Sequence, residues 1–256
     1  MSLRLLFVMA LLVSACTSAP PPEPPPVSET SVAPAVFPVT VKHEFGEVTV
    51  PKKPERVVAL GWNDVALANV LDAVVVGAVR SPDPASPNLP YVKALLSDEV
   101  LTLDPANPDF GKVAALQPDL ILATSAALDA GKYAELSKIA PTVARPSPSS
   151  TMDEDAKLAG EVLGNPVGAR RLVDSADQAV AKLKEEMPRV VGKTYHFGVG
   201  DPSPFLETLG LQPGEPGSAA VWLDVPVNVV QFLKAPNVVG VQWAIDEVKP
   251  ALSKVA

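Results

Sequence analysis

Residues 54–80 constrain the fold more than any other stretch of this chain. Their sequence is PERVVALGWNDVALANVLDAVVVGAVR. The apolar run at 57–60 predicts a buried strand, the mostly β-branched run at 74–79 predicts a second, and apolar residues recur at helical spacing between them. Asn63 precedes that helical pattern and is a residue type that favours the N-cap. A strand, a helix and a strand joined by short turns form one unit with two parallel strands.

The carboxyl edge of this unit is the first candidate for a ligand site, because ligands of open α/β sheets bind outside the carboxyl ends of the strands. Trp62 follows the first strand and Arg80 follows the second. Trp62 offers a flat apolar surface, and Arg80 offers a fixed positive charge that suits an anionic ligand. Each residue has a plainer alternative: Trp62 packs in the core, and Arg80 is a solvated loop residue.

Charge and composition exclude several classes of function. The formal net charge of −8 argues against nucleic acid as a partner. The single cysteine, Cys16, excludes an intramolecular disulfide and a thiolate metal cage, and the two histidines, His43 and His196, lie too far apart for a metal-ligand spacing. The sequence contains no nucleophile elbow, phosphate loop or dinucleotide fingerprint. We therefore expect a protein that binds without catalysis and holds no resident metal or cofactor.

The N-terminal segment predicts export and attachment to a membrane. Residues 1–16, MSLRLLFVMALLVSAC, place a basic residue before a short apolar run that cannot span a bilayer, which is typical of a signal peptide. The ending VSAC resembles the bacterial lipoprotein box, which implies a diacylglycerol lipid on Cys16. An ordinary signal peptide with an incidental cysteine is the alternative. Residues 17–38 hold eight of the chain's 29 prolines and predict an extended linker.

Residues 39–150 predict an N-terminal α/β lobe. Alternating valines around Gly46 predict a hairpin. The strand–helix–strand unit follows, and Ser125 lies just past a later strand, at the same predicted edge. Beyond these, we expect a loop at 81–90, strands at 101–103, 119–123 and 142–144, and helices at 91–96, 110–116 and 133–139. Alternating strands and helices predict a mainly parallel sheet.

Residues 151–192 predict connecting helices, at 156–163 and 167–186. A helix of about 20 residues spans about 30 Å, which is long enough to join two lobes rigidly. Residues 193–256 predict a second, reduced α/β lobe. Its predicted strands are 194–199 and 219–223, and its predicted helices are 205–209, 227–233 and 238–252. The fold class is therefore α/β, with two mainly parallel sheets joined by a long helix.

Three segments carry a resemblance to a known family: the 54–79 stretch, KVAALQPDLILATSAALDAGKYAELSKIAPTV, and QFLKAPNVVGVQWAIDEVKPAL near the C-terminus. Together with the long helix, they resemble the periplasmic substrate-binding lipoproteins that take up iron–siderophores, haem and cobalamin. The resemblance implies a chelate held in a cleft between two lobes and delivered to an ABC permease. It implies a monomer on the extracytoplasmic face of a bacterial membrane.

Candidate ligand residues follow from this arrangement. Trp62, Arg80 and Ser125 are the candidates on one wall, and His196, Asp201 and Trp222 are those on the other. Trp243 and Tyr195 are expected in the core.

The sequence also departs from the family. Where the family carries a glutamate that docks on the permease, this chain has Gly111, with Asp109 nearby. The section that carries the partner glutamate is missing around 211–217, so the second lobe is expected to be short. A degenerate relative that acts as an envelope adaptor is therefore the alternative function.

Overall fold

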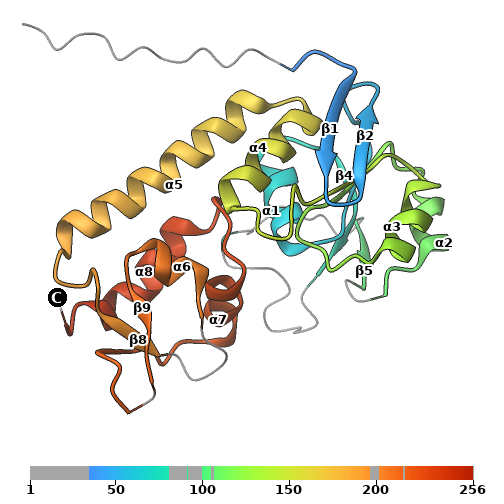
Figure 1. The fold of residues 1–256 in the computed structure, drawn as a ribbon. Coiled ribbons are helices and arrows are strands. Elements are labelled where there is room, and N and C mark those ends of the chain that lie inside the picture. The colour runs from blue at the N-terminus through green and yellow to red at the C-terminus, as the bar shows by residue number, and fades with distance from the viewer. Residues whose placement is uncertain are drawn as a thin grey trace, which may run out of the picture. The chain divides into compact units, whose positions relative to one another are not determined.

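The structure is a computed structural model that describes residues 35–80, 91, 100–104, 107–196, 202–215 and 217–255. Several predicted features lie outside these residues: the signal peptide with Cys16, most of the linker, the loop at 81–90, nearly all of the helix at 91–96, and Asp201. In the described part of the chain, no helix combines the length and apolar character needed to cross a bilayer. Figure 1 shows the arrangement of the elements.

The first sheet has five parallel strands in the order β5-β4-β3-β6-β7, which confirms the predicted parallel α/β sheet. The strands are β3 (Val57–Ala59), β4 (Val75–Val79), β5 (Leu101–Leu103), β6 (Leu120–Ala123) and β7 (Thr142–Ala144). From the central strand β3 the chain builds outward through β4 to β5, and then returns to the other side of β3 for β6 and β7. The sheet therefore changes direction between β3 and β6, where an open α/β sheet places its crevice.

Three helices and a hairpin complete the first lobe. They are α1 (Trp62–Val70), α2 (Phe110–Ala115), α3 (Ala130–Ser137) and the antiparallel pair β1 (Val39–His43) and β2 (Gly46–Val50). The prediction that Asn63 caps α1 is wrong. Gly61 is the N-cap residue and makes no side-chain bond, while Asn63 lies inside the helix with its amide buried. Asn63 is held there by a long-range partner that local pattern does not reveal.

The two connecting helices are α4 (Met152–Leu163) and α5 (Pro166–Glu186). Helix α4 begins four residues before the predicted start, because Thr151 and Glu154 form a capping box that stabilises an acidic first turn. Helix α5 has 21 residues and runs along both lobes, as predicted (Figure 1). It begins at Pro166, preceded by Asn165, whose Oδ1 accepts a bond from Gly168 N.

The second sheet has three parallel strands in the order β10-β8-β9. The second lobe contains β8 (Thr194–His196), α6 (Pro204–Thr208), β9 (Gln212–Pro213), β10 (Val221–Trp222), α7 (Val227–Lys234) and α8 (Val241–Leu252). Sequence analysis missed β9, since it is only two residues long, is exposed and contains Pro213. Proline is tolerated there because β9 is an edge strand.

One further boundary in the second lobe differs from the prediction. Helix α8 starts at Val241 and not at 238, because Asn237 Oδ1 accepts bonds from the amides of Val239 and Gly240 and holds them in a turn.

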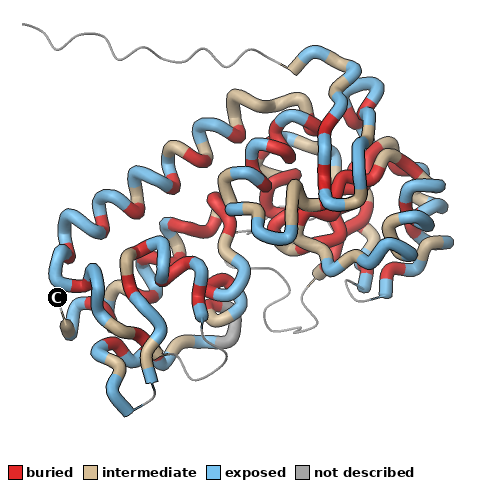
Figure 2. Tube along the Cα trace, viewed as in Figure 1, coloured by how far each residue is buried: buried red, intermediate tan, exposed pale blue. Residues whose placement is uncertain are grey.

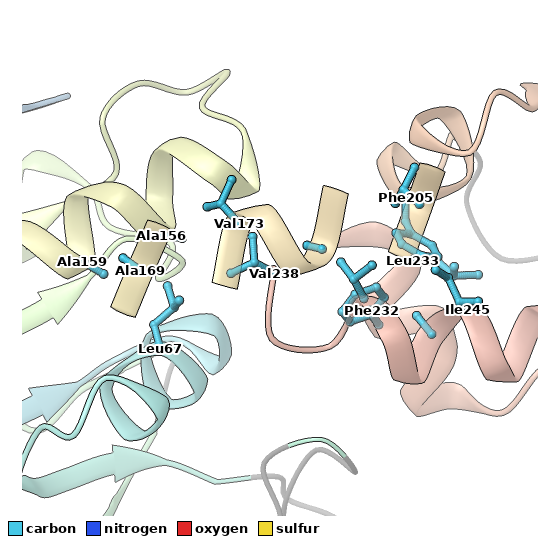
Figure 3. Close-up of a cluster of buried hydrophobic side chains, with 14 of the residues drawn as sticks. Leu67, Ala156, Ala159, Ala169, Val173, Phe205, Phe232, Leu233, Val238 and Ile245 are labelled. Carbon is cyan, nitrogen blue, oxygen red and sulfur yellow. The ribbon is translucent and has the colours of Figure 1, made fainter. Parts of the chain in front are cut away.

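Buried residues occur in both lobes and along α5 (Figure 2), and an apolar cluster extends from the first lobe into the second. A single cluster includes Leu67 in α1, Val173 in α5 and Phe232 in α7. Figure 3 shows this cluster extending from Leu67 beside α4 and α5 to Phe232 and Ile245. The core therefore ties the second lobe to the first through α5.

Candidate functional site

A hollow of about 510 Å³ lies where residues of both lobes meet. Its volume falls within the range of small-molecule sites. Its wall includes Asn63, Ser125, Arg145 and Asp155 from the first lobe and α4, and Thr208 and Lys234 from the second lobe. Two cationic and one anionic side chain therefore line it among the described residues, together with hydroxyl and amide groups that suit a polar ligand.

Arg145 is the strongest ligand candidate in this hollow. It directly follows β7, at the carboxyl edge of the sheet. Its Nε is buried, and among the described residues no hydrogen-bond partner reaches it. Its backbone oxygen accepts a 3.0 Å bond from Glu44 N at the hairpin turn, which fixes the chain at this point. Because a buried donor without a partner costs free energy, Arg145 is a candidate to bind an acceptor of a ligand in the hollow.

Asp155 lies on the first turn of α4 and is only 7% exposed. Ser150 Oγ donates a 2.8 Å hydrogen bond to its Oδ1. Burial raises the pKa of Asp155 to about 6, although the Ser150 bond and the charge of Arg145 both lower it. The hollow thus holds a buried carboxyl group with a raised pKa and, on the same wall, a guanidinium.

The crevice between β3 and β6 is filled by a buried polar network. Asp64 in α1 is fully buried, and its Oδ1 accepts bonds from Thr124 N at 2.9 Å and from Thr124 Oγ1. Ser125 N donates to the same carboxylate, and Ser125 Oγ accepts from Asp64 N at 3.3 Å. Burial raises the pKa of Asp64, while these bonds act in the opposite direction. Asp64 therefore positions Ser125 at the wall of the hollow.

A buried amide pair joins the lobes at one side of the hollow. Asn237 Nδ2 donates to Asn63 Oδ1 and to the Tyr91 hydroxyl, both at 2.9 Å. Asn63 Nδ2 donates in turn to Pro236 O at 3.3 Å. The Tyr91 ring lies 5.3 Å from that of Trp243, so a residue of the first lobe packs among second-lobe aromatic rings. This network fixes the backbone beside the hollow.

The predicted ligand residues are distributed over several places. Ser125 lines the hollow. Trp62 and Arg80 lie half-buried at the ends of neighbouring strands, as predicted, but they are not among the residues that line this hollow. Trp62 packs against the first-lobe core, in agreement with its plainer alternative.

The aromatic residues of the second lobe also have definite positions. Trp222 is 54% exposed and lines a different hollow of about 400 Å³, beside Glu247 and Lys254 of the α8 end. The His196 ring packs against Trp222 in a tilted arrangement, with ring centroids 4.8 Å apart and an interplanar angle of 47°. The expectation that Tyr195 and Trp243 belong to the core is confirmed, Tyr195 being fully buried and Trp243 partly buried against the core cluster. His43 is buried, at only 6% exposed.

Sequence analysis missed Arg145, Asp155, Asn63 and Lys234 as residues of the hollow. Arg145 had a usable signal, since it follows a predicted strand just as Ser125 does. The other three had none, because their positions depend on how α1, α4 and α7 pack. Among the described residues, no group of three or more His, Cys, Asp or Glu side chains is arranged to hold a metal ion.

Asp109, considered as a docking carboxylate, caps α2. Its Oδ1 accepts a 3.1 Å bond from Lys112 N, and the side chain remains about half exposed. Gly111 lies in the first turn of the same helix.

Comparisons with known proteins agree with this architecture. The solved structure of a periplasmic solute-binding protein from Mycobacterium smegmatis has a TM-score of 0.69 and 24% identity, over 85% of this chain and 98% of that one. Staphylococcus aureus SirA complexed with staphyloferrin B has a TM-score of 0.56 and 26% identity, over 69% of this chain and 65% of SirA. The ferric-anguibactin-binding protein FatB of Vibrio anguillarum is 26% identical over 255 residues, which covers 90% of this chain and 75% of FatB.

A family model matches more than half of the chain. It describes periplasmic binding proteins and matches residues 57–200, from the start of β3 through α5 and β8. This range contains most of the first-lobe wall of the hollow. The chain therefore belongs to the periplasmic binding protein family.

Proposed function

We propose that this protein is a lipid-anchored solute-binding protein that captures an anionic ferric siderophore in the hollow between its lobes, for import by an ABC transporter. The observation that carries the proposal is Arg145, which lines the hollow and whose buried Nε has no hydrogen-bond partner among the described residues. A guanidinium suits the carboxylate or catecholate oxygens that surround iron in such chelates. FatB and SirA, whose names or structures include ferric or siderophore ligands, support the choice of ligand class.

Electrostatics favours an anionic chelate over a neutral one. Arg145 and Lys234 line the hollow from different lobes, and Asp155 is the carboxylate among its described lining residues. Ser125, Thr151 and Thr208 add hydroxyl groups to the wall. Haem and cobalamin remain alternative ligands. Trp62, Arg80 and Trp222 remain predicted contributors.

The lipid on Cys16 is part of the same proposal. A diacylglycerol anchor and the Pro-rich segment after it would hold the binding lobes near the permease on the extracytoplasmic face of the membrane.

Arg145→Gln tests the ligand role of the guanidinium. We expect it to reduce the affinity for ferric staphyloferrin B or ferric citrate by about 10- to 100-fold, since a hydrogen bond to a charged group contributes about 1.5–3 kcal/mol. Intrinsic tryptophan fluorescence and titration calorimetry measure the affinity. Arg170→Gln is the matched control, because Arg170 is exposed on α5 and pairs only with Asp174 among its described ion-pair partners.

One outcome would reject the assigned role of Arg145, and another would reject the function. Equal affinity of wild type and Arg145→Gln would remove Arg145 from the site. If the folded protein bound none of ferric staphyloferrin B, ferric citrate, ferrichrome, haem and cobalamin at micromolar concentration, chelate transport would be excluded in favour of the adaptor function.

A further inference from the structure

Asp155 and Arg145 share the wall of the hollow, and an anion bound to Arg145 arrives beside a carboxylate that is already there. We propose that Asp155 takes up a proton when an anionic chelate binds, so that capture is coupled to proton uptake and is tighter at lower pH. This inference rests on the proposed function, because it requires an anionic ligand at Arg145. It assigns to Asp155 a regulatory role at that site.

Few described groups stabilise the ionised form of the Asp155 carboxyl group. It is buried, and its described side-chain hydrogen bond comes from the neutral hydroxyl of Ser150. Arg145 is the cation that acts on it. A ligand anion at the Arg145 guanidinium shares that cation and adds a like charge nearby, and both changes disfavour the ionised carboxyl. Protonation removes the negative charge of Asp155 and with it the repulsion of the ligand anion. The carboxyl oxygen can still accept the hydrogen bond from Ser150.

The acidic groups around Asp155 also disfavour its ionised form. The charged groups that act on it are Arg145 after β7, Asp64 in α1 and Glu154 on its own helix, and Lys234 of α7 lines the same hollow. Asp64 and Glu154 are acidic and raise its pKa. Among the charged groups of α5, Arg170 and Asp177 act on Asp153 instead. In β1, which also packs on α4, the His43 ring is engaged by Phe45 and Tyr133.

The pKa of Asp155 in the free protein makes this coupling effective near neutrality. With a pKa of about 6, the carboxyl is about one-tenth protonated at pH 7. A like charge nearby and a weakened bond to Arg145 raise a carboxyl pKa by about two, which would leave it about nine-tenths protonated. Binding would then take up about 0.8 proton at pH 7, and affinity would fall by about 25-fold from pH 6 to pH 8.

Calorimetry with ferric staphyloferrin B and ferric citrate in phosphate, HEPES and Tris buffers at pH 7 tests the coupling. The slope of observed enthalpy against buffer ionisation enthalpy gives the number of protons exchanged. We expect Asp155→Asn to lower proton uptake by about 0.8 relative to wild type, to bind at least as tightly at pH 8, and to lose most of the pH dependence. Protons exchanged by the chelate itself cancel in this difference. Glu161→Gln, an exposed acid of the same helix, is the matched control and should behave as wild type.

The outcomes separate this inference from the function on which it rests. Binding with equal proton uptake in wild type and Asp155→Asn would overturn the coupling and leave the binding function intact. Absence of binding by both chelates to wild type would reject capture of an anionic chelate itself. A loss of uptake in Glu161→Gln equal to that in Asp155→Asn would also overturn the assignment to Asp155.

Discussion

At the scale of single residues, Gly61 shows how tightly the carboxyl edge of the first sheet is packed. Its backbone is extended, with φ of −124°, so any residue could adopt its conformation. A Cβ at this position, however, would overlap Ser125 Oγ and would lie 2.6 Å from Asp64 Oδ2. The requirement for glycine is therefore steric and comes from the polar network that positions Ser125.

We predict that Gly61→Ala displaces Ser125 and weakens both the fold and the site. The unfolding free energy should fall by about 1–3 kcal/mol, as for other overpacked positions, and affinity for ferric staphyloferrin B should fall with it. Urea denaturation and fluorescence titration measure the two effects. In Gly217→Ala the new methyl group would meet no atom within 4 Å, so this control should match wild type. Equal stability of the two variants would show that the carboxyl edge of the first sheet accommodates the added methyl group at position 61 without losing stability.

At the scale of elements, the β1–β2 hairpin is held in place by His43. Its Nδ1 accepts a 3.2 Å bond from Phe45 N, and its Nε2 lies 3.2 Å from the Tyr133 hydroxyl on α3. Phe45 stacks on Tyr133 with ring centroids 4.7 Å apart. Burial lowers the pKa of His43 below 6.5. Since a protonated Nδ1 cannot accept the Phe45 bond, the hairpin favours the neutral ring.

The hairpin should therefore lose stability in mild acid. A lowered pKa in the folded state means that the unfolded chain binds the proton first, so this contribution is complete above about pH 6.5 and is lost as pH falls through the folded-state pKa. We predict that urea midpoints measured at about pH 7.5 and about pH 5.5 differ less in His43→Gln than in wild type. The raised pKa of Asp155 changes the pH dependence of stability in the opposite direction. Because Asp155 is present in both proteins, its contribution cancels when their pH dependences are compared. Identical pH dependence of the two proteins would show that His43 does not contribute.

At the scale of the whole molecule, a buried polar contact supplements the apolar core that joins the lobes. Asn63 and Asn237 are 174 residues apart in sequence, and their amides meet at 2.9 Å. Asn237 is 2% exposed and also bonds Tyr91 and the turn before α8. This second connection, away from α5, restrains the lobes beside the hollow.

We predict that Asn237→Ala lowers the unfolding free energy by about 2–3 kcal/mol, because it removes the donor that Asn63 Oδ1 has from Asn237 in a buried position. Hydrogen exchange should quicken at the amides of Val239 and Gly240 and also in α1, on the other lobe. Gln242→Ala is the control, since Gln242 is exposed and its described side-chain bond goes to Asp246. Faster exchange confined to 239–240 would show that the contact does not couple the lobes.

Prediction from sequence succeeded where local pattern decides the structure. The strands at 57–60 and 74–79, the hairpin and the long helix all follow from periodicity and turn residues, and all are present. It failed at Asn63, whose residue type suits an N-cap but whose amide is bound by Asn237. It also failed at β9, because a two-residue edge strand leaves no periodic signal.

The sequence by itself determined the α/β class and the edge at which strand-following residues such as Ser125 gather, because hydrophobic period and short connections set both. Only the tertiary structure decided which polar side chains share a hollow. Arg145, Asp155 and Lys234 come from a strand end and two helices, and packing of those elements over the core brings them together. The same packing buries Asp155 and so raises its pKa, an effect of desolvation that has no counterpart in the unfolded chain.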